Sequence, residues 1–347
     1  MALQIVEQFR VLGRGINVQV SAVMGGMDMM KQAAELSRRP HIVVATPGRL
    51  ADLLVSSPDA VSLGKIKFLV LDEADRLICP ESSFTKDGEL PAILGKVNPA
   101  AQRLLFSATM TKAVEEFSAG AGSKSVFTFK ATEEYGTVNR IKQRSMLIPS
   151  QIRDAYIWHL VSKTFAAKSM IIFVGKCKTA ELTLRMLREL GVRCVALHSR
   201  LSQSERITSL ARFKSGQVPI LISTDVGSRG LDIPSVQVVL NLDVPADARD
   251  YVHRIGRTAR AGRQGLALTF IHELDIDLVR NIESCAGVRL DAFEEAPQEK
   301  DVLVELSKVV AAKRTASMAL HDFKFGQKEA VNKAKWSRNQ PKNKFKK

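Results

Sequence analysis

The stretch FLVLDEAD at residues 68–75 decides how the rest of the chain is interpreted. Its first four residues are apolar, which is typical of a strand that is covered on both faces of a parallel sheet. The carboxylates that follow, Asp72, Glu73 and Asp75, are then expected at the carboxyl edge of that sheet, where α/β proteins bind ligands. Such an aspartate can hold magnesium on a nucleotide, and such a glutamate can orient or deprotonate a water molecule. A solvated acidic turn after a buried strand is the alternative interpretation.

Apolar runs alternate with helical patterns along most of the chain, which predicts βα units, parallel sheets and an α/β fold. A first series of strands is expected at residues 41–45, 66–71 and 102–106. A second series is expected at residues 142–148, 169–174, 193–197, 219–223, 236–240 and 266–271. Helices are expected at residues 179–190 and 202–213, and a last amphipathic stretch at 302–310.

A chain of 347 residues is long enough for about two domains, each with its own core. The polar stretch 131–139 is interpreted as the linker between them. This places a first domain at residues 1–130 and a second at 140–290. Residues 291–347 are then an amphipathic segment followed by a basic tail that is expected to be disordered.

The net charge of +15 favours a polyanionic partner. Part of this charge lies in residues 328–347, where eight basic residues face a single acid, Glu329. No apolar run reaches the length of a membrane span, so no membrane partner is expected. The four cysteines form no CxxC pair and the six histidines lack metal-ligand spacing, so reduced cysteines are expected.

Residues 251–265 carry the strongest signal, because arginines at 254, 257, 260 and 263 recur at every third position among glycines. On a helix, Arg257 and Arg260 would occupy adjoining positions of one face. Forked guanidinium groups bind phosphate in a bidentate manner, and an arginine finger stabilises charge on a transferring phosphoryl group. A general RNA-binding patch or a localisation signal is the alternative.

Several other expected strands are followed by polar or glycine-rich segments. Ser107-Ala-Thr109 offers two hydroxyls, although it could simply cap the next helix. Residues 223–232, STDVGSRGLD, combine glycine amides, hydroxyls and carboxylates, a mixture suited to sugar and phosphate. Thr46-Pro-Gly-Arg49 predicts a phosphate-facing arginine or a bare turn. Gly25-Gly26 could admit an RNA backbone, unless the methionines around it are core filler.

In this order, Gly-Gly, TPGR, DEAD, SAT, STDVGSRGLD and HRIGRTAR resemble the motifs of DEAD-box ATP-dependent RNA helicases over about residues 1–285. The resemblance implies two RecA-like domains joined by a flexible linker, acting as a monomer on RNA with ATP and Mg²⁺ as cofactors. It also implies that ATP binds between the domains and that RNA lies across both.

The resemblance implies a role for individual residues. Asp72 would bind Mg²⁺ through water, and Glu73 would position the hydrolytic water. Arg257 and Arg260 would reach the γ-phosphate, while Gly230 and Asp232 would contact the nucleotide. Coupling between the domains would involve Asp75, Ser107, Thr109 and His253. RNA would be contacted by Gly25, Gly26, Thr46, Arg49, Gln203, Arg206 and Thr224.

The stretches Phe-Arg-Val-Leu-Gly and Gly-Gly-Met-Asp-Met are similar to those of the subgroup that acts in small-subunit ribosome assembly. This implies pre-ribosomal RNA as the partner, a protein activator, and a location in the nucleus and nucleolus.

The chain departs from the family pattern because it contains no phosphate-cradling GxxxxGK[ST]. By resemblance, this loop and the adenine-reading Q motif would lie upstream of Met1. A triphosphate would lack its amide cradle and lysine, so we expect little ATP hydrolysis by these residues alone. The strand that carries the loop would also be missing from the first sheet, which predicts exposed apolar surface there. The alternative function is a short form that binds RNA or a partner without hydrolysing ATP.

Overall fold

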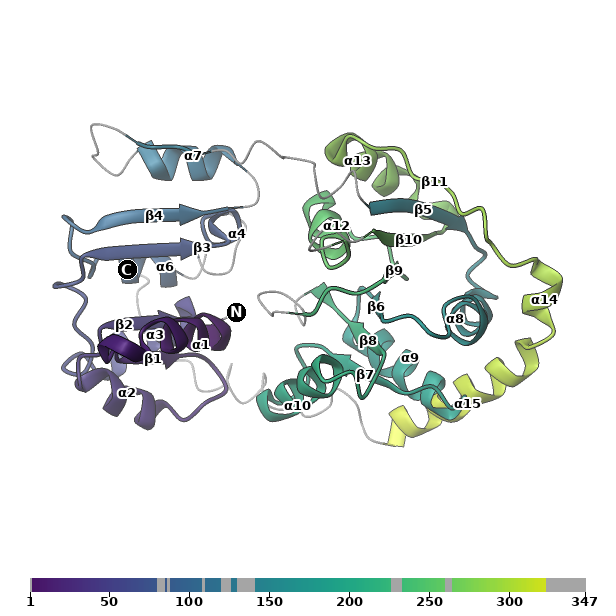
Figure 1. The fold of residues 1–347 in the computed structure, drawn as a ribbon, viewed down its shortest axis with the longest axis horizontal. Helices are drawn as coiled ribbons and strands as arrows, with labels where there is room; N and C mark the ends of the chain where they lie inside the picture. Colours follow the sequence, from purple (N-terminus) through teal and green to yellow (C-terminus); the bar gives the residue numbers. More distant parts are fainter. Residues whose placement is uncertain are drawn as a thin grey trace, which may run out of the picture. The chain divides into compact units, whose positions relative to one another are not determined.

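The computed structural model describes residues 2–79, 85, 88–107, 110–119, 126–129, 141–225, 233–259 and 264–322. They divide into two compact units, one within residues 2–129 and one within residues 141–322. Each unit contains parallel strands with helices packed around them, which confirms the predicted α/β class (Figure 1). The predicted linker at 131–139 and the tail beyond residue 322 lie outside the described residues.

The first unit contains two parallel strand pairs. Strand β1 (Val20–Val23) pairs with β2 (Ile42–Ala45), and β3 (Phe68–Asp72) pairs with β4 (Gln102–Phe106). The three predicted strands are confirmed to within two residues; β1 was missed because Ser21 and Ala22 weaken its apolar pattern. The helices are α1 (Ala2–Leu12), α2 (Met29–Ser37), α3 (Pro47–Ser56), α4 (Ala74–Leu77), α6 (Glu89–Leu94) and α7 (Lys112–Ala119).

Two apolar clusters hold this unit together. In one, Leu53 of α3 is fully buried beside Ile93 of α6. In the other, Leu71 of β3 is buried with Val114 of α7. Leu69 of β3 packs against both clusters, so β3 links the two strand pairs through side-chain packing.

One face of the β3–β4 pair is not covered. The side chains of Phe68, Val70 and Phe106 are 59%, 51% and 58% exposed. Asp72 pairs with Phe106, and side chains alternate along a strand, so these three lie on one face and Leu71 on the other. Parallel sheets are normally covered on both faces. The exposed apolar surface expected in the first sheet is therefore confirmed for the described residues, and the interpretation of Phe68–Leu71 as a strand covered on both faces is wrong for them.

This difference between the two faces gives a stability prediction. Phe68→Ala is expected to change the free energy of unfolding by less than about 1 kcal/mol, because the ring is already mostly exposed. Leu71→Ala should cost about 2–5 kcal/mol, because it opens a cavity in a buried cluster. Urea unfolding followed by circular dichroism measures both. A Phe68→Ala cost equal to that of Leu71→Ala would show that the ring is covered in solution.

The second unit is built on a seven-stranded parallel sheet with the order β11-β5-β10-β9-β6-β8-β7. Its strands are β5 (Ile141–Leu147), β6 (Met170–Phe173), β7 (Cys194–Leu197), β8 (Ile220–Ser223), β9 (Val238–Asn241), β10 (Gly265–Ile271) and β11 (Asp291–Ala292). Every residue of β6, β7, β8 and β9 is buried, as their continuous apolar runs predict. All six predicted strands of this series are confirmed to within two residues, and only the two-residue β11 was missed.

Helices of the second unit connect and cover these strands (Figure 1). They are α8 (Arg153–His159), α9 (Cys177–Glu189), α10 (Gln203–Lys214), α12 (Ala248–Ile255), α13 (Ile276–Ala286), α14 (Glu299–Leu303) and α15 (Leu306–Asp322). The predicted start of α10 is confirmed, because Ser202 and Glu205 form a capping box there.

The segment after residue 290 is more structured than its sequence suggests. The amphipathic stretch predicted at 302–310 is part of α14 and α15, and α15 continues to Asp322. Val302 and Val309 are 0% and 1% exposed and belong to the main core of the second unit, together with Leu160 and Leu187. Lys313 also forms an ion pair with Asp154 of α8 at 2.5 Å. Both helices therefore belong to the second unit.

Candidate functional site

The carboxylates of the FLVLDEAD stretch lie where β3 ends and α4 begins. Asp72 is exposed at the end of β3, and its Oδ1 accepts a hydrogen bond from the Glu73 amide at 3.0 Å. Glu73 adopts a left-handed conformation with φ of 53°, which is rare for a residue with a side chain. Backbone strain of this kind is typical of functional positions. Its carboxylate lies 3.5 Å from Arg76.

The third carboxylate differs from the other two, because Asp75 is only 1% exposed. Ser107 directly follows Phe106, the residue that pairs with Asp72, so the ends of β3 and β4 lie side by side. Ser107 is exposed and does not cap α7, because Thr111 does so: its Oγ1 accepts a hydrogen bond from the Val114 amide at 3.4 Å. The alternative of a simple helix cap is thus wrong for Ser107. Thr109 lies outside the described residues.

A hydrogen bond joins the Thr46–Arg49 segment, where α3 begins, to the Gly25–Met27 loop. Arg49 Nη1 donates to the carbonyl oxygen of Met27 at 2.8 Å, which ties the start of α3 to the loop after β1. Gly26 has a φ of +78°, a backbone conformation that favours a residue without a side chain. Met27, Met29 and Met30 are 43%, 37% and 75% exposed, so these three methionines are not core filler. The predicted residues Gly25, Gly26, Thr46 and Arg49 therefore come together at one edge of the unit.

In the second unit, the strands are all parallel, so their carboxyl ends share one edge of the sheet. Thr224 follows β8 at this edge, and its amide donates to the carbonyl of Leu197, the last residue of β7, at 3.2 Å. Gln203 and Arg206 lie one turn apart on α10, where Arg206 Nη1 donates to Gln203 Oε1 at 3.3 Å. Burial lowers the pKa of Arg206 from its ordinary value. These three predicted residues belong to adjoining elements of the edge.

The arginine-rich segment is not a continuous helix. Helix α12 ends at Ile255, with Gly256 as its C-cap residue, and Arg257 lies beyond it. The backbone then bonds to the segment that precedes β9, where the Val236 amide donates to the carbonyl of Arg257 at 3.0 Å. Ala259 has a left-handed φ of 57°. The prediction that Arg257 and Arg260 share a helix face is therefore wrong for Arg257. Its carbonyl accepts a hydrogen bond from the Val236 amide rather than from a later turn of the same helix.

His253 lies on α12, one turn before Arg257. The other predicted nucleotide residues, Gly230, Asp232 and Arg260, lie outside the described residues. Sequence reasoning missed one residue of this segment, Arg254, which is 2% exposed and bound to Asp225 by two hydrogen bonds of 2.6 and 2.7 Å. Its spacing from the other arginines gave no sign that it is buried.

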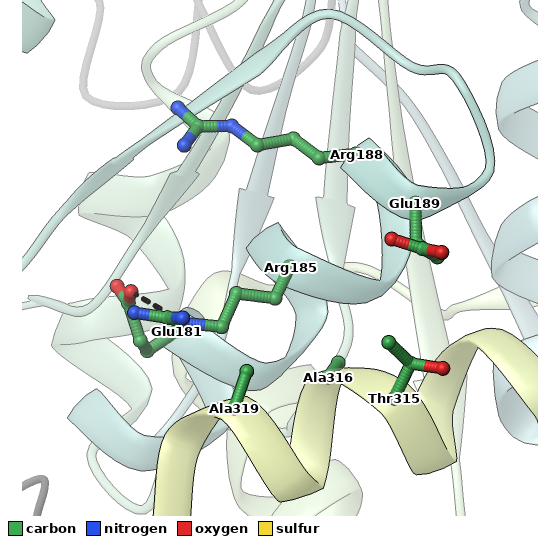
Figure 2. Close-up of a pocket in the computed structure, with 7 residues that line it drawn as sticks. All are labelled: Glu181, Arg185, Arg188, Glu189, Thr315, Ala316 and Ala319. Carbon is green, nitrogen blue, oxygen red and sulfur yellow. Dashed lines mark hydrogen bonds and ion pairs between the residues drawn. The ribbon is translucent and has the colours of Figure 1, made fainter. Parts of the chain in front are cut away.

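A shallow pocket lies elsewhere in the second unit, between α9 and α15 (Figure 2). Its lining residues are Glu181, Arg185, Arg188, Glu189, Thr315, Ala316 and Ala319. Within it Arg185 donates to Glu181 at 3.0 Å, and His198 lies on the other Glu181 oxygen at 3.4 Å. The hydrogen bond to His198 lowers the pKa of Glu181. None of the predicted site residues lines this pocket.

The described residues contain no group of three or more histidine, cysteine, aspartate or glutamate side chains placed to hold a metal ion. None of their helices combines the length and apolar character needed to cross a bilayer.

The fold and the ordered motifs define a DEAD-box ATP-dependent RNA helicase, and the chain belongs to that family. Residues 1–117 match the DEAD/DEAH box helicase family, and residues 153–262 match the helicase conserved C-terminal domain.

Individual relatives agree with this assignment. The chain is 46% identical over 341 residues to the human Probable ATP-dependent RNA helicase DDX49. These aligned residues cover 96% of this chain and 69% of the relative. It is 43% identical to the ATP-dependent RNA helicase dbp8 of Schizosaccharomyces pombe, over 94% of this chain and 73% of the relative. The structure of S. cerevisiae Dbp5 bound to RNA and ADP BeF3 has a TM-score of 0.74 at 28% identity, covering 89% of this chain and 78% of that chain. Both units are accordingly RecA-like.

Proposed function

We propose that this protein remodels RNA duplexes and RNA–protein complexes, coupled to ATP hydrolysis, during ribosomal RNA processing. The observation that carries the proposal is the position of two groups of residues at strand ends. Asp72 and Glu73 lie at the end of β3, and Thr224 and Arg257 lie beyond β8 and α12. Carboxylates and arginines in these places suit phosphoryl transfer, in which positioning and electrostatic stabilisation supply most of the catalysis.

The Asp72 side chain suits the role of a magnesium ligand. Its side chain is exposed, and Oδ1 accepts only the Glu73 amide among the described residues, which leaves Oδ2 for a water of the metal. Protein sites hold Mg²⁺ through one or two carboxylates together with waters and substrate phosphates. Bound there, the ion would neutralise charge on the phosphates. Glu73 would orient the attacking water, and Arg257 with Arg260 would stabilise charge on the γ-phosphate.

RNA would be contacted by two surfaces, one in each unit. In the first unit Arg49 holds the Gly25–Met27 loop against the start of α3, which presents loop amides and the Thr46 hydroxyl together. In the second unit Gln203, Arg206 and Thr224 would supply further polar contacts to phosphates and sugars. Asp75, Ser107, Thr109 and His253 would couple the two units during the cycle.

The ribosomal role rests on the similarity of two sequence stretches to the small-subunit assembly subgroup, and the identity to DDX49 and dbp8 supports it. We expect the protein to act as a monomer with a protein activator, in the nucleolus. Crosslinking in cells should recover pre-ribosomal RNA with this protein. Recovery of messenger RNA alone would contradict the ribosomal role.

The enzymatic proposal is tested by RNA-stimulated ATP hydrolysis and duplex unwinding. Two forms are compared: the 347-residue polypeptide, and the same polypeptide extended at its N-terminus by a segment that contains GxxxxGK[ST]. The 347 residues themselves contain no such loop, so we expect turnover in the extended form only. If neither form hydrolyses ATP, although both are folded and bind RNA, the non-hydrolysing RNA-binding alternative is favoured.

Residues 328–347 are expected to add sequence-independent RNA affinity. They carry eight basic residues and one acid, and each phosphate contact to single-stranded RNA contributes about 0.7 to the slope of log affinity against log salt. A chain that ends at residue 327 should therefore show a flatter salt dependence of RNA binding than the full chain. An unchanged slope, measured by fluorescence anisotropy, would exclude the tail from RNA contact.

A further inference from the structure

Arg254 is a buried cation at the end of α12. Its side chain is 2% exposed, and burying a charge is unfavourable unless partners replace water. Its Nε and Nη2 donate to the two carboxylate oxygens of Asp225 at 2.6 and 2.7 Å, in the bidentate geometry of a strong ion pair. Its Nη1 donates to the carbonyl of Asp243 at 2.7 Å. The guanidinium also lies 5.3 Å from the ring centroid of Phe173.

These contacts join four elements at one edge of the sheet. Asp225 lies two residues beyond β8, Asp243 two residues beyond β9, and Phe173 ends β6. The Asp243 carboxylate is itself fixed, because it accepts the Gly175 amide at 2.7 Å and Arg153 Nη1 at 2.9 Å. A single side chain therefore holds the ends of three strands against the last turn of α12.

The neighbours of this ion pair give it a functional meaning. Thr224 directly precedes Asp225, and Arg257 lies three residues after Arg254, just beyond the end of α12. The Arg257 amide donates to the carbonyl of Arg254 at 3.1 Å, so a shift of Arg254 would also move the end of the helix. Direct contact between Arg254 and RNA does not fit its burial.

We propose that Arg254 is a positioning residue that locks Thr224 and Asp225 to the end of α12, so that Thr224 is held ready for RNA. This rests on the proposed function, in which Thr224 contacts RNA. The role requires a planar fork rather than a positive charge, because a lysine cannot bind both carboxylate oxygens and the Asp243 carbonyl in the same geometry.

Arg254→Lys in the full chain tests the proposal, with binding of fluorescein-labelled single-stranded oligo(A) as the readout. Affinity is expected to fall about tenfold, within the usual range of coupling between sites, while the salt slope stays unchanged. The matched control is Arg249→Lys on the same helix, where Arg249 forms a bidentate pair with Asp247 but both side chains are partly exposed. The control should change affinity less than twofold.

A second substitution separates positioning from a general loss of structure. Thr224→Val removes the hydroxyl, and if Arg254 acts through Thr224, the double variant should bind RNA no more weakly than the weaker single variant. Amide hydrogen exchange should rise at Thr224 and at residues 256–258 in Arg254→Lys, and at neither place in the control. If Arg254→Lys does not fold, Asp225→Asn disrupts the same pair from the other side and should give the same loss of affinity.

Three results would overturn the proposal: unchanged affinity in Arg254→Lys, multiplicative losses in the double variant, or exchange that rises at only one of the two places. A folded wild-type chain that binds no RNA would overturn the proposed function as well. Wild-type binding that Arg254→Lys leaves intact would overturn the positioning role alone.

Discussion

ATP turnover should fall by about two to four orders of magnitude when Glu73 is replaced by glutamine, the range expected for loss of a general base. The substitution is made in the form of the protein that hydrolyses ATP. Glutamine preserves the size of the side chain and removes only the carboxylate that would orient the attacking water. RNA binding should remain, because Glu73 lies at the end of β3 rather than in the proposed RNA-binding loops.

The fold should also tolerate this change. The Glu73–Arg76 pair lies near the surface at 3.5 Å, and such pairs contribute about 0–1 kcal/mol. Glu116→Gln, at an exposed position of α7 in the same unit, is the matched control and should keep full activity. Turnover by Glu73→Gln within tenfold of wild type would show that another group activates the water.

A chain that ends at residue 298 should lose much of the stability of its second unit. It lacks α14 and α15, and with them the buried side chains of Val302, Val309 and Leu320. Each large apolar side chain contributes about 1.5–3 kcal/mol on full burial, so the loss of these three is about 4.5–9 kcal/mol. This approaches the whole stability of an ordinary domain, about 5–15 kcal/mol. We expect a partly unfolded second unit.

The control is a chain that ends at residue 322, which keeps both helices and should be as stable as the full chain. Trp158 is then the only tryptophan, and it lies under the ammonium group of Lys308 on α15 at 5.0 Å, so its fluorescence reports on this contact. Two point variants refine the test. Val309→Ala should cost about 2 kcal/mol, whereas Val310→Ala, at a side chain that is 54% exposed, should cost less than about 0.5 kcal/mol. Equal costs would mean that α15 packs differently in solution.

Sequence patterns predicted the strands of the second unit well because buried parallel strands are continuous apolar runs between polar turns. They predicted the end of the chain less well, because α15 packs through small residues. Ala312 and Ala316 are 6% and 3% exposed in the main core, yet alanine adds little to an amphipathic pattern. The close approach of α15 to α9 is a tertiary contact that such a pattern does not reveal.

The candidate site shows the same division. The motif order by itself indicated the family, and it named the carboxylates, hydroxyls and arginines that the proposal uses. It could not distinguish Asp75, which is only 1% exposed, from the exposed Asp72 three residues earlier. Nor could it show the left-handed backbone of Glu73, which depends on how β3 joins α4.

The sequence by itself determined the α/β class, the alternation of strands and helices, and membership of the DEAD-box family, because these depend on local composition and on the order of short motifs. Only the tertiary structure decided which member of the arginine repeat is buried and where the helix that carries it ends. Arg254 is bound to Asp225, 29 residues away in the sequence, and to a carbonyl at the end of another strand. Burial and hydrogen bonding are set by such distant partners, whereas a sequence pattern records only near neighbours.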